Sequence, residues 1–133
     1  MGVYHWHRYT ASESMQRISV QHEVPWVAVG DFLDDWRRSA KEDRVALVRE
    51  PLASVIPPEL QQWAAFFAAA VEELCLQDGL PVPEWTLEQQ YILPEPWYVE
   101  ARTQPLRELQ EKTTPDTFKH RNILGGDRML SRV

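Results

Sequence analysis

The sequence predicts an all-α protein, a compact and irregular helical domain with one long central helix and about five shorter helices. Two observations support this fold class. Apolar residues recur with helical spacing in two segments, one that includes Trp36 and one centred on Phe67. No segment alternates apolar and polar residues as a half-buried strand does. We assign residues 25–133 to this single domain and residues 1–24 to a partly ordered N-terminal arm, in which aromatic residues occur without a clear period.

The first clear helix is predicted over about Asp31 to Ala40. Its apolar residues have the spacing i, i+3, i+4 and i+7, which places them on one helical face: Val29, Phe32, Leu33 and Trp36. Asp31 is the expected N-cap, because a carboxylate at that position accepts a hydrogen bond from an unpaired backbone N–H group. A second short helix is expected over about Glu42 to Arg49, and Pro51 ends it.

The strongest helical pattern lies between Pro58, which suits the first turn of a helix, and Gly79, which suits its C-terminal cap. The middle of this segment, AAFFAAAV, is apolar nearly all round. A helix of that composition is buried on more than one side, either as the central core helix or as part of a subunit interface. Shorter helices are expected over about residues 87–93, 104–112 and 116–122, the last two preceded by Thr103 and by Thr114-Pro115.

The charge is unevenly distributed along the chain. Residues 1–100 contain 7 Lys/Arg against 16 Asp/Glu, a net charge of −9, whereas residues 101–133 contain 7 against 4, a net charge of +3. The overall charge of −6 disfavours non-specific nucleic-acid binding, because the chain as a whole repels phosphates. The lone cysteine, Cys75, suits a reducing compartment, and no apolar run has the length of a membrane span. We therefore expect a cytoplasmic protein.

Three sets of residues are candidates for chemistry, and each also has a structural explanation. His5 and His7 would point to one side of an extended arm, as metal ligands do, but an exposed aromatic arm is the better explanation, because no third ligand is fixed nearby in the sequence. Asp31 and Asp35 lie one helical turn apart, and acidic residues near a helix N-terminus are favourable by themselves. Cys75 lies on the apolar stripe of the long helix, where a thiol is normally unreactive. The structural explanations are favoured, so we predict no catalytic residue, no metal site and no cofactor.

Two features near the C-terminus are candidates for partner binding. Trp97 and Tyr98 follow Pro94 and Pro96, which stiffen the segment, and large rigid aromatic side chains are good anchors for a partner. Lys119 and Arg121 lie at the end of a short helix and offer positive charge to an acidic partner. The internal alternative is that Trp97 fills the core while Arg121 pairs with an acidic residue of the N-terminal two-thirds. The sequence leaves both alternatives open and slightly favours the internal one.

The order of several motifs resembles that of a group of short, uncharacterised bacterial proteins. The resemblance rests on VPWVAVGDFLDDWRR at residues 24–38, PEW at 83–85, PEPWY at 94–98 and TPDTFKHRNIL at 114–124. Members share a P-W-aromatic segment followed by T/S-P-x-x-F-x-x-R-N-aliphatic, which Trp97, Phe118, Arg121 and Asn122 match. Leu124 departs from the aromatic residue that is usual at its position. Some members resemble small regulatory or antitoxin-like partners of a second protein, and the resemblance implies no catalytic residue.

These observations favour a non-enzymatic intracellular module that acts through protein interaction or regulation, with an acidic protein as the expected partner. A homodimer through the long helix is a further option. One alternative function is a DNA-binding transcriptional regulator, with helices at residues 31–40 and 42–49 forming a helix-turn-helix. Glu42, Asp43 and Glu50 on the would-be recognition helix oppose that alternative. The other alternative is an enzyme of a type that sequence motifs do not identify.

Overall fold

The computed structural model describes residues 8–52 and 56–131. Within these ranges the chain is mostly helical and contains only two strands of two residues each, so the prediction of an all-α fold is confirmed. The elements in chain order are α1 (Ala11–Ser19), α2 (Pro25–Arg38), α3 (Lys41–Val48), η1 (Pro58–Leu60), α4 (Gln61–Asp78), η2 (Glu84–Leu87), η3 (Gln89–Tyr91), β1 (Trp97–Tyr98), α5 (Gln104–Thr113), α6 (Asp116–Lys119) and β2 (Ile123–Leu124), where η marks a 3₁₀ helix.

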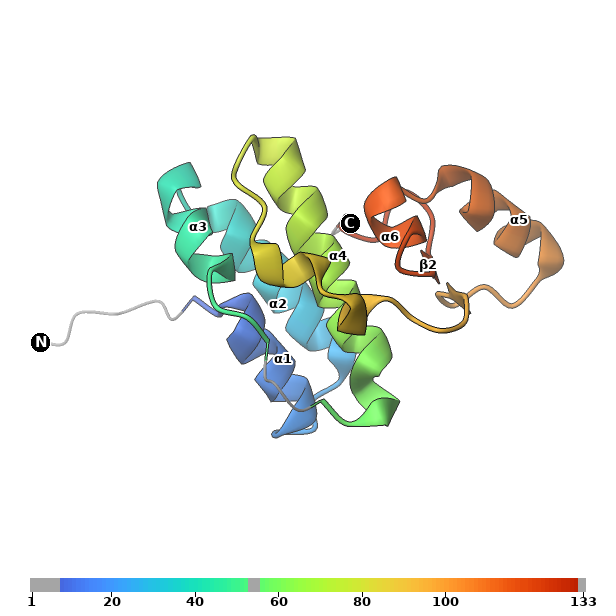
Figure 1. Cartoon of the computed structure of the whole chain (residues 1–133), viewed down its shortest axis with the longest axis horizontal. Coiled ribbons are helices and arrows are strands. Elements are labelled where there is room, and N and C mark those ends of the chain that lie inside the picture. The colour runs from blue at the N-terminus through green and yellow to red at the C-terminus, as the bar shows by residue number, and fades with distance from the viewer. Residues whose placement is uncertain (1–7, 53–55, 132–133) are drawn as a thin grey trace, which may run out of the picture.

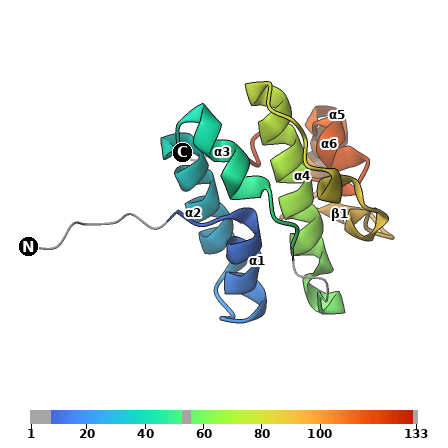
Figure 2. The same ribbon diagram turned by 60° about the vertical axis from the view of Figure 1, so that its left-hand side comes forward.

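The helix α4 runs through the middle of the molecule. In Figure 1, α1, α2 and α3 lie on one side of α4, and α5, α6 and β2 lie on the other. Figure 2 shows the same order after a turn of 60°. The short helices η2 and η3 also pack on α4. The chain therefore divides around one central helix into an N-terminal helical layer and a smaller C-terminal layer.

The burial of α4 confirms its prediction as the central core helix. None of residues 64–71 is more than 2% exposed. Gly79 ends the helix in a left-handed conformation (φ 67°), and its N–H donates to the carbonyls of Cys75 and Leu76, as the sequence predicts. Because other elements of the same chain cover residues 64–71, the middle of α4 offers no surface for a homodimer.

Helix α1 lies within residues 1–24, the segment expected to be a partly ordered N-terminal arm, and it forms the ordered part of that segment. Thr10 caps the helix, since its hydroxyl accepts from the N–H of Glu13 at 3.0 Å and its own N–H donates to the Glu13 carboxylate at 3.0 Å. Three apolar residues on one face of the helix are buried: Ala11, Met15 and Ile18. This face packs against α2 and α4 and extends the core.

Helix α2 begins six residues before the expected start. Pro25 occupies its first turn, and Val24 is the N-cap. The prediction that Asp31 caps the helix is therefore wrong, and Asp31 lies inside it. The predicted apolar face is confirmed, because its four residues are all buried: Val29, Phe32, Leu33 and Trp36. Helix α3 agrees with the predicted range of 42–49 to within one residue at each end.

The segment after Gly79 is less regular than expected. The helix predicted over 87–93 is replaced by η2 and η3, which Glu88 separates in an extended conformation. The strands β1 and β2 form a parallel two-stranded ladder that pairs Trp97 with Ile123 and Tyr98 with Leu124. This ladder was not predicted, because two-residue strands are too short to show an alternating pattern.

The last two helices differ in how well their caps were predicted. Thr103 caps α5 as expected, with its hydroxyl accepting from the N–H of Leu106 at 3.4 Å. Helix α6 is only four residues long, and Pro115 is its N-cap. The Thr114 hydroxyl instead donates to the carbonyl of Gln110 at 2.6 Å and accepts from the N–H of Gly126 at 2.9 Å. Thr114 thus joins the end of α5 to the C-terminal segment.

Candidate protein-interaction surface

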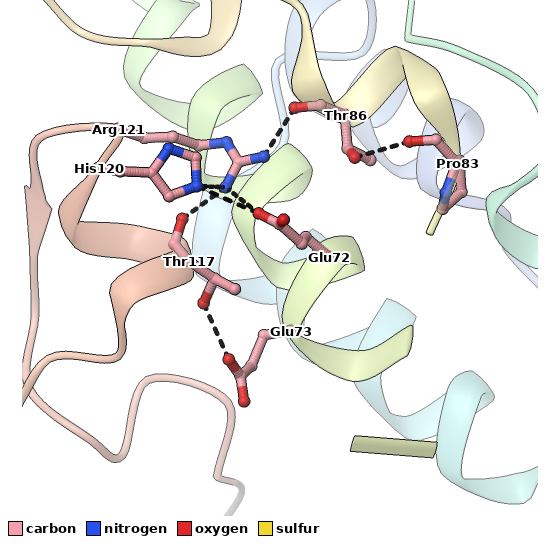
Figure 3. Close-up of polar contacts among 7 residues, drawn as sticks. All are labelled: Glu72, Glu73, Pro83, Thr86, Thr117, His120 and Arg121. Atoms are coloured by element: carbon pink, nitrogen blue, oxygen red, sulfur yellow. Dashed lines mark hydrogen bonds and ion pairs between the residues drawn. The ribbon is translucent and has the colours of Figure 1, made fainter. Parts of the chain in front are cut away.

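Arg121 is a buried internal anchor, so the prediction that it faces a partner is wrong. Its side chain is 1% exposed, and one terminal nitrogen, Nη1, donates to Glu72 on α4 at 2.7 Å. The other terminal nitrogen, Nη2, donates to the carbonyl of Thr86 at 2.7 Å, and Nη1 also donates to the carbonyl of Thr117. Figure 3 shows these bonds converging on the guanidinium. Arg121 therefore ties α4, η2 and α6 together, as the internal alternative expected.

Two further contacts strengthen the junction between α4 and α6. The hydroxyl of Thr117 donates to the Glu73 carboxylate at 2.9 Å. His120 lies on the outside of the junction, where its Nε2 is 3.2 Å from Glu72 Oε1 and 3.0 Å from the Arg121 guanidinium (Figure 3). Adjacent carboxylates of one helix thus hold separate residues of the C-terminal layer.

Trp97 packs against the core, again as the internal alternative expected. Its ring lies edge-on to Trp63 with centroids 5.2 Å apart, and 6.4 Å from the ring of Phe66. Trp26 also lies edge-on to Trp63, at 4.9 Å, and donates its indole N–H to Glu100 at 3.0 Å. The tryptophans thereby join α2, α4 and β1 in one half-buried aromatic cluster.

Tyr98 and Lys119 remain at least partly exposed, but they do not form a shared face with Arg121. The hydroxyl of Tyr98 donates to Glu111 on α5 at 2.5 Å, and this bond raises the pKa of Tyr98. The guanidinium of Arg107, also on α5, lies 5.1 Å from the Tyr98 ring centroid. Tyr98 therefore holds α5 against β1. Lys119 is half-buried at the end of α6.

Helix α5 has an unusual orientation, with polar side chains on its inner face. Gln110 donates from Nε2 to the carbonyl of Val99 at 2.9 Å, beside the contacts of Arg107 and Glu111 with Tyr98. Leu109 lies on a different side of the helix, Leu106 lies one turn before Gln110, and the two leucines are 53% and 46% exposed. No residue of α5 is fully buried. The apolar side of α5 is therefore available to another molecule.

The surroundings of α5 contain a small excess of positive charge, three Lys/Arg against two Glu over residues 102–113. Arg102, Arg107 and Lys112 are exposed, and none of them forms an ion pair with another residue of the ranges 8–52 and 56–131. The two carboxylates of α5 accept hydrogen bonds within the chain, Glu111 from Tyr98 and Glu108 from Gln104 at 3.5 Å. Because these donors are neutral, both carboxylates keep their charge, and residues 102–113 have a net charge of +1, which favours an acidic partner only modestly.

The remaining sequence candidates have structural roles in the described chain. Asp31 pairs with Arg17 at 2.9 Å, and Asp35 is buried and accepts from the backbone N–H of Tyr9 at 2.9 Å. Cys75 is buried in the core, which raises the pKa of its thiol to about 11, with a smaller contribution from Asp78. The neutral thiol dominates at physiological pH, which suits a packing residue.

The His5–His7 pair falls outside the described residues. Within the described ranges, no three His, Cys, Asp or Glu side chains are grouped as a metal site would require. None of the helices there combines the length and the apolar composition needed to cross a bilayer.

The helices of the alternative DNA-binding hypothesis are present as α2 and α3. Leu47 and Val48 attach α3 to the core. Its exposed residues include Glu42 and Asp43 in the first turn, which a phosphate backbone would repel.

Comparison of the chain with protein-family models, curated proteins and solved structures finds no match in any of the three. The interpretation of the surface therefore depends on its own geometry.

Proposed function

We propose that this protein is a non-enzymatic protein-interaction module that binds a second protein through α5. The observation behind this proposal is the orientation of α5, which packs polar side chains on β1 and exposes Leu106 and Leu109. A short helix normally turns its apolar side toward its own core, because that burial is what stabilises it. Two leucines of one helix that remain about half exposed suit a surface that a partner covers.

The resemblance to small bacterial proteins, some of them regulatory or antitoxin-like, supports a role in which the module acts on its partner. A cytoplasmic location is part of the same proposal, because the lone cysteine suits a reducing compartment. The site expected from the sequence changes in composition. Tyr98 contacts the inner side of α5. Trp97 and Arg121 hold the C-terminal layer in place, and Lys119 lies on α6.

The test compares two pairs of substitutions in a pull-down from the native cell, with mass spectrometry of the captured proteins. The test variant is Leu106→Gln/Leu109→Gln on α5. The matched control is Leu76→Gln/Leu87→Gln, which changes two equally exposed leucines on α4 and η2. Far-UV circular dichroism and the thermal midpoint verify that both variants fold.

We expect the wild type and the control variant to capture the same protein and the α5 variant to lose most of it. Each half-exposed leucine contributes on the order of 1 kcal/mol when a partner buries the rest of it, so losing two weakens binding by about 30-fold. Capture that is equally strong with the α5 variant and the control would contradict α5 as the docking element.

A further inference from the structure

Resting on the proposed function, we infer that α5 receives an acidic amphipathic helix of the partner protein. That helix lays apolar residues on Leu106 and Leu109 and places carboxylates near Arg102 and Lys112. Three properties of the surface favour such a partner: its saturated backbone, the direction of its apolar stripe and its cations without ion-pair partners.

The backbone of α5 limits how a partner binds. Its interior N–H and C=O groups are engaged in helical hydrogen bonds, so α5 has no open edge to which an extended strand can be added. A partner therefore makes contact through side chains. Leu106 and Leu109 are three residues apart and form a stripe along the helix axis. The complement of such a stripe is the apolar stripe of another helix, with leucine-like residues one turn apart.

The charges near the stripe favour one sign of charge on the partner. Arg102 precedes the helix, and Lys112 lies in its last turn, so cations flank the stripe at both ends. Neither forms an ion pair within the described ranges, although Glu108 and Glu111 of the same helix keep their negative charge and leave residues 102–113 at a net charge of +1. Carboxylates on the partner would gain Coulomb attraction without displacing an existing ion pair.

The N-terminal layer differs in this respect, because several of its cations are already paired. Arg17 contacts Glu23 at 2.7 Å and Asp31 at 2.9 Å, and Arg44 contacts Asp78 at 2.7 Å. Residues 102–113 contain three Lys/Arg against two Glu, a net charge of +1, and all three cations are exposed.

The experiment uses the full chain and two synthetic helical peptides of about 20 residues as probes. Both peptides have leucines spaced three and four residues apart on one face. One peptide has glutamates flanking this face and the other has lysines. Each is labelled with fluorescein, and its dissociation constant is measured by fluorescence anisotropy at low and at physiological ionic strength.

We expect the glutamate peptide to bind at least about tenfold more tightly than the lysine peptide, since several exposed charge pairs change sign. Physiological salt should narrow this difference. The variant Arg102→Glu/Lys112→Glu should prefer the lysine peptide, whereas the control Lys41→Glu/Arg49→Glu, two exposed cations of the α3 region, should keep the wild-type preference.

Four results would overturn the inference: no binding of either peptide, equal binding of both, an unchanged preference in Arg102→Glu/Lys112→Glu, or self-association of the wild type that the α5 substitutions abolish. If capture from the native cell still depends on Leu106 and Leu109, the proposed function stands and only the chemistry of the partner is wrong. If capture does not depend on those leucines, the proposed function itself fails.

Discussion

Helices α4 and α5 are attached to the rest of the protein by different interactions, α4 by apolar burial and α5 by polar contacts. Helix α4 has ten buried residues and packs on neighbours from both layers, whereas α5 has none. Side chains that bind α5 to the rest of the protein are polar: Gln110 bonds to a carbonyl, and Arg107 and Glu111 contact Tyr98. Apolar burial is worth about 1.5–3 kcal/mol for each large side chain, and a hydrogen bond about 1 kcal/mol net.

The difference shows how a small protein divides stability and binding between its parts. The apolar surface of α4 is consumed in the core, so α4 has little left to offer a partner. No apolar side chain of α5 is buried in the fold, so Leu106 and Leu109 remain exposed for an interface. The buried Arg121 fixes the C-terminal layer to α4 by charge and hydrogen bonding. The predictions below test this division, from the largest expected effect to the smallest.

The largest effect is expected at the centre of α4. Phe67 is fully buried and lies edge-on to Phe32 of α2, with ring centroids 5.9 Å apart. Phe67→Ala should lower the free energy of unfolding by ~4 kcal/mol, because it leaves a cavity between two helices. Chemical denaturation followed by circular dichroism measures the loss. Leu76→Ala, at an exposed position of the same helix, should stay within ~0.5 kcal/mol, and similar losses in both variants would contradict the central role of α4.

A somewhat smaller loss is expected at the junction of the layers. Arg121→Ala removes the cation from Glu72 and leaves the carbonyls of Thr86 and Thr117 without this donor. The free energy of unfolding should fall by ~3 kcal/mol, as for other broken buried ion pairs. The neighbouring substitution Lys119→Ala is the control and should cost less than ~0.5 kcal/mol. A midpoint that Arg121→Ala leaves unchanged would show that polar anchoring of the C-terminal layer is unimportant.

Features with a local pattern could be predicted from the sequence. The apolar residues of α2 and α4 repeat with helical spacing, so Phe32, Trp36 and Phe67 were identifiable as core residues. Local chemistry likewise identified the caps at Thr103 and Gly79. Helix α1 also has a local pattern, the Thr10–Glu13 capping box, and a search for that spacing would have found it.

The candidate surface was less predictable, because it depends on which way elements face. The pairing of Arg121 with Glu72 joins residues 49 apart, and many other carboxylates were equally plausible partners from the sequence. The spacing of Leu106 and Leu109 indicates a helical stripe but not whether that stripe meets the core. Only the contacts of Gln110 and Glu111 with the β1 segment show that the leucines lie elsewhere.

A further prediction concerns acid, which should weaken the N-terminal layer through an ion pair. Glu23 accepts from Arg17 at 2.7 and 2.8 Å, and these bonds hold the pKa of the Glu23 carboxyl below its ordinary value of 4.5. A lowered pKa in the folded state stabilises the protein above the unfolded pKa, and that stabilisation is lost as the pH falls through the folded pKa. The thermal midpoint of the wild type should therefore fall below about pH 4.5.

The control for this pH prediction is Glu23→Gln, which cannot ionise. This variant should start with a lower midpoint at neutral pH and lose less of it on acidification than the wild type. Parallel curves for the two proteins would mean that acid acts through other carboxylates.

The smallest effects are expected in α5. There, removing a polar side chain should lower the free energy of unfolding more than removing an apolar one. Gln110→Ala removes the bond from Nε2 to the Val99 carbonyl and should lower the free energy of unfolding by about 1 kcal/mol. Leu109→Ala shortens a side chain that is already 53% exposed, so it should change that free energy by less than about 0.5 kcal/mol. Both substitutions introduce alanine into the same helix, which makes their helix propensities comparable. Paired denaturation curves distinguish the two, and a larger loss from Leu109→Ala would mean that the chain itself uses the leucine face for folding, leaving no free docking surface on α5.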